Sequence, residues 1–384
     1  MAPSSLHFCT SDSWGGLELY ACTLMAELKK AGFESLAICR PKSRIEAFLK
    51  ENGIRYTYLP NYSPVSLDSI RFIKSLILQH DIQVLHVHFH KDVWPASLAL
   101  WGDAGRKLFL SIYMGVPKKK DILHRIIYSK VNAIITSSQE LKDRLPSLYP
   151  VPASKIRLLP YGRRIEHYRR DELKRKAIRA KHGLQPDDVV VGTMVRIDPG
   201  KGAIDFARSF LYIENALAEK TKFVIVGEPT RRGRAKQGES PYEPACEEYL
   251  RQIEKFVAEK RLSGKILLAG YQNDLIGYLS AFDVFVFPSR DELYSLVVLD
   301  AMAMGLPVIA ARSGGNLQQI KEGVSGLMYE VANSEDLAKK IELCLREPSL
   351  GKELGEKAKD FVRTVHSMDS TIRSLVEIYK GEDH

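Results

Sequence analysis

Two carboxylates flank the start of a predicted helix in the second half of the chain. Glu292 follows the apolar run AFDVFVF, which is typical of a buried strand, and Asp300 lies eight positions later in LVVLDAMAMG, whose apolar residues recur at helical spacing. The first turn of that helix, at Ser295, Leu296 and Val297, carries N–H groups that have no partner within the helix and that favour an anion. The pattern suits a sugar joined to a nucleotide diphosphate, with the sugar at Glu292, the phosphates at the helix start and the ribose at Asp300. An ordinary strand–loop–helix unit has the same spacing.

Two cations occupy a similar strand-to-helix connection earlier in the chain. VGTMVRIDPGKG places Arg196 at the end of a strand and Lys201 at the start of a helix. Such a pair, a short loop apart, can neutralise a diphosphate leaving group without a metal ion. Ordinary surface charge is the alternative that the spacing leaves open.

Further polar candidates stand at strand ends in the first half. Gly15 and Gly16 occupy the first strand-to-helix turn, where glycine lets a backbone approach a ligand. His86, His88 and His90 close the fourth apolar run, and strand alternation puts all three on one face. We favour a polar lining of the binding site over a metal site, because ligands along one strand diverge and no partner cluster is evident.

Strands and helices alternate along the chain, which predicts parallel sheets covered on both faces with ligands at the carboxyl ends of the strands. The length suits two domains. We expect a first Rossmann-like domain over residues 1–162, a basic linker over 163–188 and a second Rossmann-like domain over 189–365. No G-x-G-x-x-G fingerprint follows the first strand, so a nicotinamide enzyme is disfavoured.

The segment PSRDELYSLVVLDAMAMGLPVIA, with the Ser-Gly-Gly at 313–315, resembles the signature of the retaining glycosyltransferases of family 4. In that family a Pro-Ser precedes a Glu, seven residues and a second Glu. Asp300 replaces the second Glu here, Leu293-Tyr294-Ser295 replaces Gly-Phe-Gly, and Gln318 or Gln319 stands at a later acidic position. VRIDPGKG is similar to the family's R-x(4–5)-K-G element. The resemblance is strong over 191–329 and weaker before it.

The resemblance implies the GT-B fold, in which two Rossmann-like domains face each other across a cleft. The first domain would bind the acceptor, the second the donor, and a last helix over about 366–384 would return to the first domain. The family usually has a His near the reacting sugar where this chain has Tyr113, a phenol that can donate a hydrogen bond but cannot easily carry a proton. Tyr113, His88 and His90 are therefore the expected acceptor-side residues.

The same resemblance assigns the donor residues. Arg196 and Lys201 would hold the phosphates and act with Glu292 as the catalytic groups. The other expected donor contacts, beside the helix-start residues and Asp300, are Gly15, Gly16, Gly227, Tyr271 and Gln272. We expect transfer of a sugar, from a UDP-sugar, to a glycan, lipid-linked or small-molecule acceptor in polysaccharide biosynthesis, with no cofactor and no obligatory metal. A nucleotide-sugar epimerase and a nucleotide-sugar-binding protein with decayed catalysis remain as alternatives.

Net charge and composition indicate which classes of binding partner are plausible for this chain. The chain has 384 residues and a net charge of +9, and nine Lys or Arg stand against three acids in 163–181, with a second basic segment at 117–130. A solvated helix face is one reading, and peripheral contact with an anionic membrane is another. No nucleic-acid-binding motif accompanies the charge. The N-terminus lacks a signal-like segment, and no apolar run is long enough to span a bilayer. The five scattered cysteines fit reduced, buried thiols. We therefore expect a cytoplasmic protein, peripheral at most to the inner face of the membrane.

Overall fold

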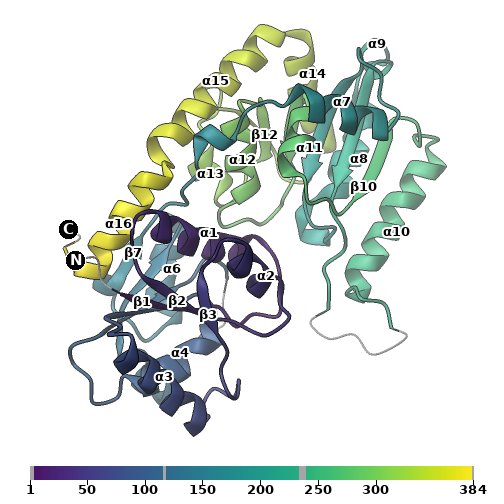
Figure 1. Cartoon of the computed structure of the whole chain (residues 1–384). Helices are drawn as coiled ribbons and strands as arrows, with labels where there is room; N and C mark the ends of the chain where they lie inside the picture. Colours follow the sequence, from purple (N-terminus) through teal and green to yellow (C-terminus); the bar gives the residue numbers. More distant parts are fainter. Residues whose placement is uncertain (1–3, 116–117, 233–238, 383–384) are drawn as a thin grey trace. The chain divides into compact units, whose positions relative to one another are not determined.

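The predicted apolar runs form strands, and these strands assemble into two fully parallel sheets. The computed structural model describes residues 4–115, 118–232 and 239–382, which divide into unit 1, Met1–Gly162 with Met368–His384, and unit 2, Arg163–Ser367 (Figure 1). Most strands are Val/Ile/Leu-rich and buried along their length, as expected for sheets with helices on both faces.

Within the described residues, the sheet of unit 1 has seven strands in the order β3-β2-β1-β4-β5-β6-β7. The order reverses between β1 and β4, which are paired from Ser5↔Val84 to Phe8↔Val87. In such sheets the reversal opens a ligand-binding crevice at the carboxyl ends of the two strands. The strands are β1 (Ser5–Phe8), β2 (Ser35–Ile38), β3 (Arg55–Thr57), β4 (Val84–Val87), β5 (Lys107–Ser111), β6 (Val131–Thr136) and β7 (Ile156–Leu158).

The sheet of unit 2 has six strands within the same described ranges, in the order β10-β9-β8-β11-β12-β13. Its order reverses between β8 and β11, which are paired at Val284↔Val191 and Phe285↔Gly192. The strands are β8 (Val189–Met194), β9 (Thr221–Val226), β10 (Ile266–Gly270), β11 (Val284–Phe287), β12 (Val308–Ala311) and β13 (Leu327–Tyr329).

Helices lie between successive strands in both units, and α14, α15 and α16 follow the last strand. In unit 1 they are α1 (Gly16–Lys30), α2 (Arg44–Glu51), α3 (Leu67–Gln79), α4 (Val93–Ala99), α5 (Ile122–Tyr128), α6 (Gln139–Leu148) and α16 (Met368–Lys380), with short 3-10 turns η1 (His90–Asp92) and η2 (Ala153–Lys155). In unit 2 they are α7 (Glu172–Lys181), α8 (Ala203–Ser209), α9 (Asn215–Ala218), α10 (Pro244–Glu259), α11 (Leu275–Ala281), α12 (Leu296–Met304), α13 (Asn316–Gln319), α14 (Ser334–Arg346) and α15 (Pro348–Val365), with turns η3 (Ile165–His167), η4 (Pro199–Lys201) and η5 (Phe210–Tyr212).

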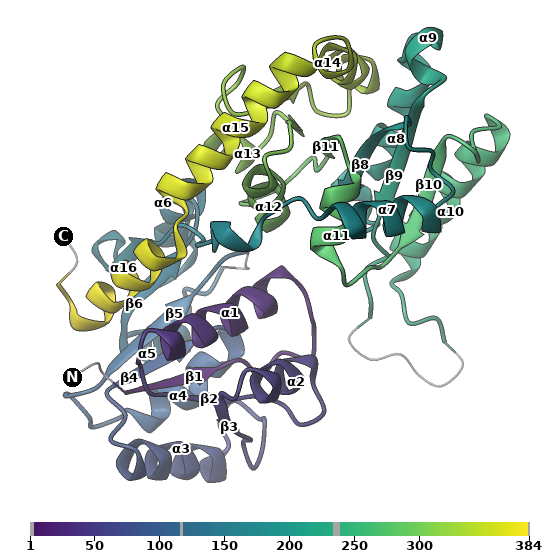
Figure 2. The same ribbon diagram turned by 45° about the horizontal axis from the view of Figure 1, so that its top comes forward.

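The last helix belongs to the first unit. Helix α16 packs beside α1, at the yellow end of the colour range in Figure 2. The Nδ1 atom of buried His86 lies 2.6 Å from the Tyr379 hydroxyl, and Lys107 donates to the Tyr379 carbonyl oxygen at 3.0 Å. These contacts anchor the final helix to strands β4 and β5.

Residues 163–188 are not a separate linker but part of unit 2. Helix α7 packs on α11, and Arg175 and Arg179 pair with Asp283 at 2.9 and 2.6 Å. Arg179 also donates to the Asp188 carbonyl oxygen at 2.9 Å. Several arginines of this basic segment are therefore paired inside unit 2. A count of charges in the sequence cannot tell such paired arginines from arginines on a solvated helix face.

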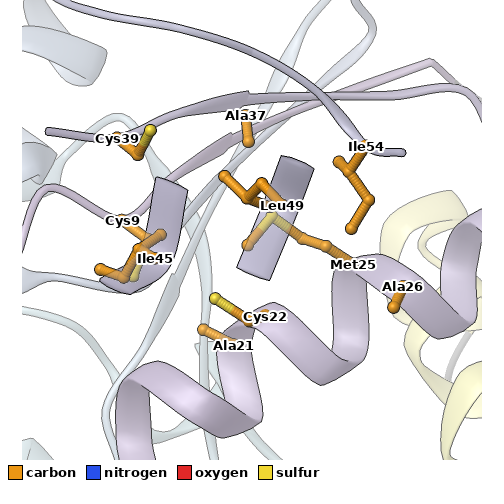
Figure 3. Close-up of a cluster of buried hydrophobic side chains, with 10 residues drawn as sticks. All are labelled: Cys9, Ala21, Cys22, Met25, Ala26, Ala37, Cys39, Ile45, Leu49 and Ile54. Carbon is orange, nitrogen blue, oxygen red and sulfur yellow. The ribbon is translucent and has the colours of Figure 1, made fainter. Parts of the chain in front are cut away.

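A core cluster that α1 and α2 form with the ends of β1 and β2 contains three of the cysteines (Figure 3). All five cysteines are free and buried, as the sequence predicts. Burial raises the pKa of Cys22 and that of Cys39 to about 12, so both remain neutral thiols that pack as small apolar groups. Within the described ranges, every helix is too short or too polar to cross a bilayer.

Candidate functional site

Lys201 and Glu292 meet where the strand order of unit 2 reverses. Lys201 follows β8 and Glu292 follows β11, and the Lys201 Nζ and Glu292 Oε2 atoms lie 2.9 Å apart. The side chains are 18% and 20% exposed, so both are partly shielded yet reachable. The sequence placed these residues on separate connections, and the sheet order brings them together at the position where open α/β sheets bind ligands.

Local backbone contacts fix the loop that carries Lys201. Asp198 accepts from the N–H of Gly200 at 2.9 Å and closes the turn that η4 forms. Gly202 has φ of +68°, and a Cβ there would lie 2.0 Å from the carbonyl oxygen of Pro288. Only glycine allows this left-handed turn to press against the end of β11, and the contact sets the distance between the two loops.

A second ion pair, which sequence reasoning missed, supports the same loop. Arg290 donates from Nη2 and Nε to the two carboxylate oxygens of Asp205 at 2.7 and 2.8 Å, and Asp205 is buried on α8. The backbone N–H of Arg290 donates to the Gly200 carbonyl oxygen at 2.9 Å. A bidentate pair of this kind holds a planar geometry and fixes the approach to Glu292. The spacing of one Arg and one Asp 85 residues apart gives no signal for it.

The start of α12 offers two free amides instead of three. The N–H of Ser295 donates to Gln319 Oε1 at 2.9 Å, and Gln319 Nε2 donates back to the Ser295 carbonyl oxygen at 2.7 Å. The expected phosphate contact at the Ser295 amide is therefore corrected, because a buried glutamine already occupies it. The N–H groups of Leu296 and Val297 have no hydrogen bond among the described residues, and both residues are partly exposed.

Asp300 is tied to the start of unit 2. Its Oδ1 accepts from Arg163 Nε and from the Tyr168 hydroxyl, the latter at 2.6 Å, and the Asp300 and Arg163 side chains are 9% and 10% exposed. Arg163 also donates its backbone N–H to the His366 carbonyl oxygen at 2.7 Å. Asp300 thus anchors the residues at which the chain enters unit 2, and ribose binding by Asp300 stays a prediction.

The remaining donor-side residues lie at the ends of β8, β9 and β10. Arg196 is exposed after β8 and forms no ion pair with a described residue, so its charge is available. Gly227 packs against β8, since a Cβ there would lie 1.8 Å from the Val195 carbonyl oxygen. Tyr271 is exposed, and Gln272 donates to the Ala269 carbonyl oxygen at 2.6 Å. Donor contacts at these positions stay predictions.

The glycine turn of unit 1 is already engaged by a carboxylate. Gly15 donates its N–H to Glu18 Oε2 at 3.0 Å, and Ser11 donates its hydroxyl to Glu18 Oε1 at 2.8 Å. Gly15 has an extended backbone, with φ of −148°, and Gly16 opens α1 beside it. Both glycines are exposed, so their approach to a ligand stays a prediction.

Histidines form a buried cluster in unit 1 that includes one residue the sequence did not single out. His7 on β1 is the register partner of His86, and the His86 and His88 rings lie 4.1 Å apart, which confirms their common face. His7 Nδ1 lies 3.1 Å from His88 Nε2 and His7 Nε2 lies 3.1 Å from the Ser5 hydroxyl. His90 leaves the strand and begins η1.

Hydrogen bonds account for most nitrogens of this cluster. Besides the contact with Tyr379, His86 lies 2.8 Å from the Ser111 hydroxyl, which donates to the Tyr113 hydroxyl at 3.0 Å. The ligand atoms of His7, His86 and His88 lie within 4.8 Å of one another, but a metal would have to replace these contacts. The expectation that His88 and His90 line the acceptor site stays untested.

The expected acceptor contact at Tyr113 is corrected. The Tyr113 side chain is packed against the rings of Tyr20 and Tyr161, at 5.7 and 5.2 Å between centroids, and the residue is 8% exposed. Its hydroxyl faces Ser111 in the interior. Tyr113 is therefore part of the aromatic core of unit 1.

Two family models together match most of the chain. The model described as glycosyl transferases group 1 matches residues 174–361, and the model described as glycosyltransferase family 4 matches residues 14–167.

Curated relatives are similar over a shorter stretch. They include D-inositol 3-phosphate glycosyltransferase of Saccharomonospora viridis, 26% identical over 69% of this chain and 59% of that protein. Alpha-D-kanosaminyltransferase of Streptomyces kanamyceticus is 25% identical over 65% of this chain and 61% of that protein. The match therefore spans about three fifths of the length of these relatives.

Solved structures resemble the chain over nearly its whole length. A glycosyltransferase from Rickettsia africae has a TM-score of 0.83 at 19% identity, covering 99% of this chain and 98% of that one. Anabaena HepE in complex with UDP and glucose has a TM-score of 0.79 at 17% identity, covering 98% and 99%. Two parallel-sheet units with these neighbours define the GT-B fold. With the two family models, they show that the chain belongs to the GT-B glycosyltransferases of the family 4 type.

Proposed function

We propose that this protein transfers a sugar from a UDP-sugar to a glycan, lipid-linked or small-molecule acceptor, with retention of the anomeric configuration. The observation that carries the proposal is the Lys201–Glu292 pair at the reversal point of the unit 2 sheet, beside the free amides of Leu296 and Val297. Anabaena HepE, a structural neighbour, is known in complex with UDP and glucose, which supports the choice of UDP.

The positive groups suit a departing diphosphate. Negative charge develops on the leaving group during transfer, and preorganised cations and amides stabilise such charge most strongly where water is limited. Lys201 is held by Glu292 before the donor arrives, whereas Arg196 has no ion pair among the described residues. We assign Lys201, Arg196 and the two amides to the diphosphate, and no metal is required for this neutralisation.

Glu292 carries the sugar in this proposal. One carboxylate oxygen pairs with Lys201, and the carboxylate can also accept hydrogen bonds from sugar hydroxyls or steady the positive charge at the anomeric carbon. The acceptor attacks from the face that the diphosphate leaves, and the leaving phosphate oxygen takes the acceptor proton. This route needs no enzymic base, which agrees with an interior Tyr113.

Thermal shift with UDP, GDP, ADP and TDP tests the donor assignment first. A nucleotide at one hundred times its dissociation constant should stabilise the protein by about 2.7 kcal/mol, and we expect the largest shift with UDP. A larger shift with another nucleotide would replace UDP in the proposal. No shift with any of the four would overturn the donor site.

Product analysis with the matching nucleotide sugar tests the reaction. Transfer predicts release of the nucleotide that depends on an acceptor, and a product whose anomeric configuration, read by NMR coupling, equals that of the donor. A new nucleotide sugar formed without acceptor would identify an epimerase instead. Nucleotide binding with no turnover across acceptor classes would identify a binding protein.

A further inference from the structure

One short helix of unit 1 exposes apolar side chains that a folded protein usually covers. On α5, Ile122 is 74% exposed, Leu123 is 62% exposed and Ile126 is 43% exposed, whereas Ile127 and Tyr128 are buried. Ile126 stands four residues after Ile122 and three after Leu123, and both spacings make side chains neighbours on a helix surface, so Ile126 joins the three into one face. Exposed Met114 precedes the helix. We call Ile122, Leu123 and Ile126 the apolar face of α5.

Cations surround this face with little compensation. Lys118, Lys119 and Lys120 precede the helix and Arg125 and Lys130 follow within it or just after it, against a single acid, Asp121, in residues 118–130. Asp121 caps α5 and bonds to His124, so it is already engaged. Burial lowers the pKa of Lys119, the charge of Asp121 raises it in part, and the charge of Lys91 lowers it further, so an added anion would favour the charged lysine.

The lysines around the apolar face of α5 lie at the carboxyl-end edge of the unit 1 sheet. Lys91 follows β4 in η1, and Lys118–Lys120 follow β5, so both groups stand beyond the carboxyl ends of neighbouring strands. His90, half-buried in the same region, has a pKa lowered by burial and by the charges of Lys119 and Lys91. Cations from two connections therefore converge on the edge at which parallel sheets bind their ligands.

The combination favours a lipid surface over other partners. Lysines are depleted in protein interfaces, and no nucleic-acid-binding motif accompanies the charge of this segment. A helix with bulky apolar residues on one side and basic residues around them is typical of interfacial binding to anionic lipids. The other basic segment, in α7, has Arg175 and Arg179 paired with Asp283 and lacks such a face.

We propose that the apolar face of α5 and the surrounding cations Lys91, Lys118, Lys119 and Lys120 dock unit 1 on an anionic lipid bilayer. Ile122, Leu123 and Ile126 enter the boundary between headgroups and acyl chains, and the lysines contact lipid phosphates. Docking is independent of the transfer chemistry, so vesicle binding and turnover can fail separately.

Flotation of the full chain with vesicles tests the proposal. We expect binding to vesicles of phosphatidylcholine mixed with phosphatidylglycerol, and little binding to phosphatidylcholine alone. The triple variant Lys118→Glu, Lys119→Glu, Lys120→Glu should weaken partitioning by at least roughly 100-fold, since each lysine near such a surface contributes about fivefold. Ile122→Ser, Leu123→Ser, Ile126→Ser should weaken it at least about tenfold through lost apolar burial.

A charge-matched control separates the patch from net charge. Lys74→Glu, Lys176→Glu, Lys352→Glu changes three exposed lysines on α3, α7 and α15 and should keep vesicle binding within about twofold. An equal loss in this control, or equal wild-type binding to neutral vesicles, would overturn the proposal. So would saturable binding of inorganic phosphate or single-stranded DNA at the patch without vesicle binding. Far-ultraviolet circular dichroism checks that each variant is folded; if the triple variants are not, the single variants Lys118→Glu and Leu123→Ser give the same test with smaller expected losses.

Discussion

Lys201 and Glu292 are paired with each other in the structure, and each is assigned to a different part of the donor. Replacing either by alanine removes one group of the site and leaves the other without its partner. We expect Lys201→Ala and Glu292→Ala each to lower turnover by at least ~100-fold, the size of a single electrostatic deletion in an active site. Steady-state kinetics with the nucleotide sugar that the thermal-shift panel selects would measure the loss.

Lys339→Ala is the matched control. Lys339 pairs with Glu335 at 2.8 Å, close to the separation in the Lys201 pair, but on the exposed surface of α14. Its loss should leave turnover within about twofold of wild type, because an exposed pair contributes little. Near-wild-type turnover in Lys201→Ala or Glu292→Ala would remove the catalytic assignment.

The Arg163–Asp300 pair should contribute mainly to the stability of unit 2. Both side chains are about nine-tenths buried, and removal of the Asp300 carboxylate takes away the buried acceptor that Arg163 Nε and the Tyr168 hydroxyl share. Asp300→Ala should lower the free energy of unfolding by about 3–5 kcal/mol, measured in urea, while Glu335→Ala on the exposed pair should change it by about 1 kcal/mol or less. Equal effects of the two substitutions would show that Asp300 is not structurally important.

At this scale the sequence identified the charged residues better than the partners of those residues. Lys201 and Glu292 were found because motifs recur around them, and their contact follows from the strand order. Ser295 and Tyr113 were misjudged because the competing groups, Gln319 and the tyrosines around Tyr113, come from distant segments. Burial by remote residues leaves no local pattern.

The loop that carries Lys201 can approach the end of β11 because Gly202 has no side chain. Gly202 and Gly183 both have left-handed backbones, with φ of +68° and +66°, but a Cβ would clash with Pro288 only at Gly202 and would meet nothing within 4 Å at Gly183. Gly183→Ala should therefore cost about 1–2 kcal/mol of stability from backbone strain alone. Gly202→Ala should cost more and should also weaken nucleotide binding, because the Lys201 loop must move away from β11.

Urea unfolding and nucleotide titration of both variants measure the difference. Equal losses of stability in Gly202→Ala and Gly183→Ala, with nucleotide affinity unchanged, would contradict a role for the contact between Gly202 and Pro288. The comparison isolates the contact, because the backbone conformation is nearly the same in the two glycines.

Elements with a strong local pattern were predictable. The apolar runs predicted strands β1 to β12. Helix α12 begins after its N-cap Ser295 and ends at its left-handed C-cap Gly305. Strand β13 has three residues and no such run, and 163–188 was misread as a linker because the pairing of its arginines with Asp283 is not local.

The stability of unit 1 should depend on pH through its histidines. Burial lowers the pKa of His7 to about 3 and lowers the pKa values of His86 and His88 well below their ordinary value. Below pH 6.5 the unfolded chain takes up protons that the folded unit does not, so stability falls as pH falls. Burial raises the pKa of Asp92 to about 6. Between pH 6 and the lower pKa of the unfolded chain, the folded unit therefore binds one more proton at Asp92 than the unfolded chain does, which raises stability as pH falls.

The three buried histidines against one carboxyl leave a net difference of about two protons, to which half-buried His90, whose pKa is also lowered, adds in the same direction. Each proton contributes about 1.4 kcal/mol per pH unit, so stability should fall by about 2–3 kcal/mol per unit between about pH 6 and pH 4. Urea unfolding followed at several pH values, with His7→Gln to remove one contribution, measures the slope. A flat profile over this range would show that the histidines are protonated in the folded unit.

Alternation of strands and helices was sufficient to predict the fold class, since right-handed parallel connections leave few topologies. The sheet orders themselves were not predicted, because they depend on which strands pair and not on any one strand. The return of α16 to unit 1 came from family resemblance and has no marker in the helix sequence itself.

That return makes unit 2 an insertion within unit 1, with consequences for synthesis. On the ribosome, residues 163–367 are synthesised as one continuous stretch, after residues 1–162 and before α16. The first 162 residues of unit 1 are synthesised before α16. Until α16 follows, His86 lacks its contact with the Tyr379 hydroxyl and Lys107 lacks its hydrogen bond to the Tyr379 carbonyl oxygen. The first unit to be translated is thus the last to be completed, and a nascent chain stalled before Met368 would present an unfinished unit 1 to chaperones and proteases.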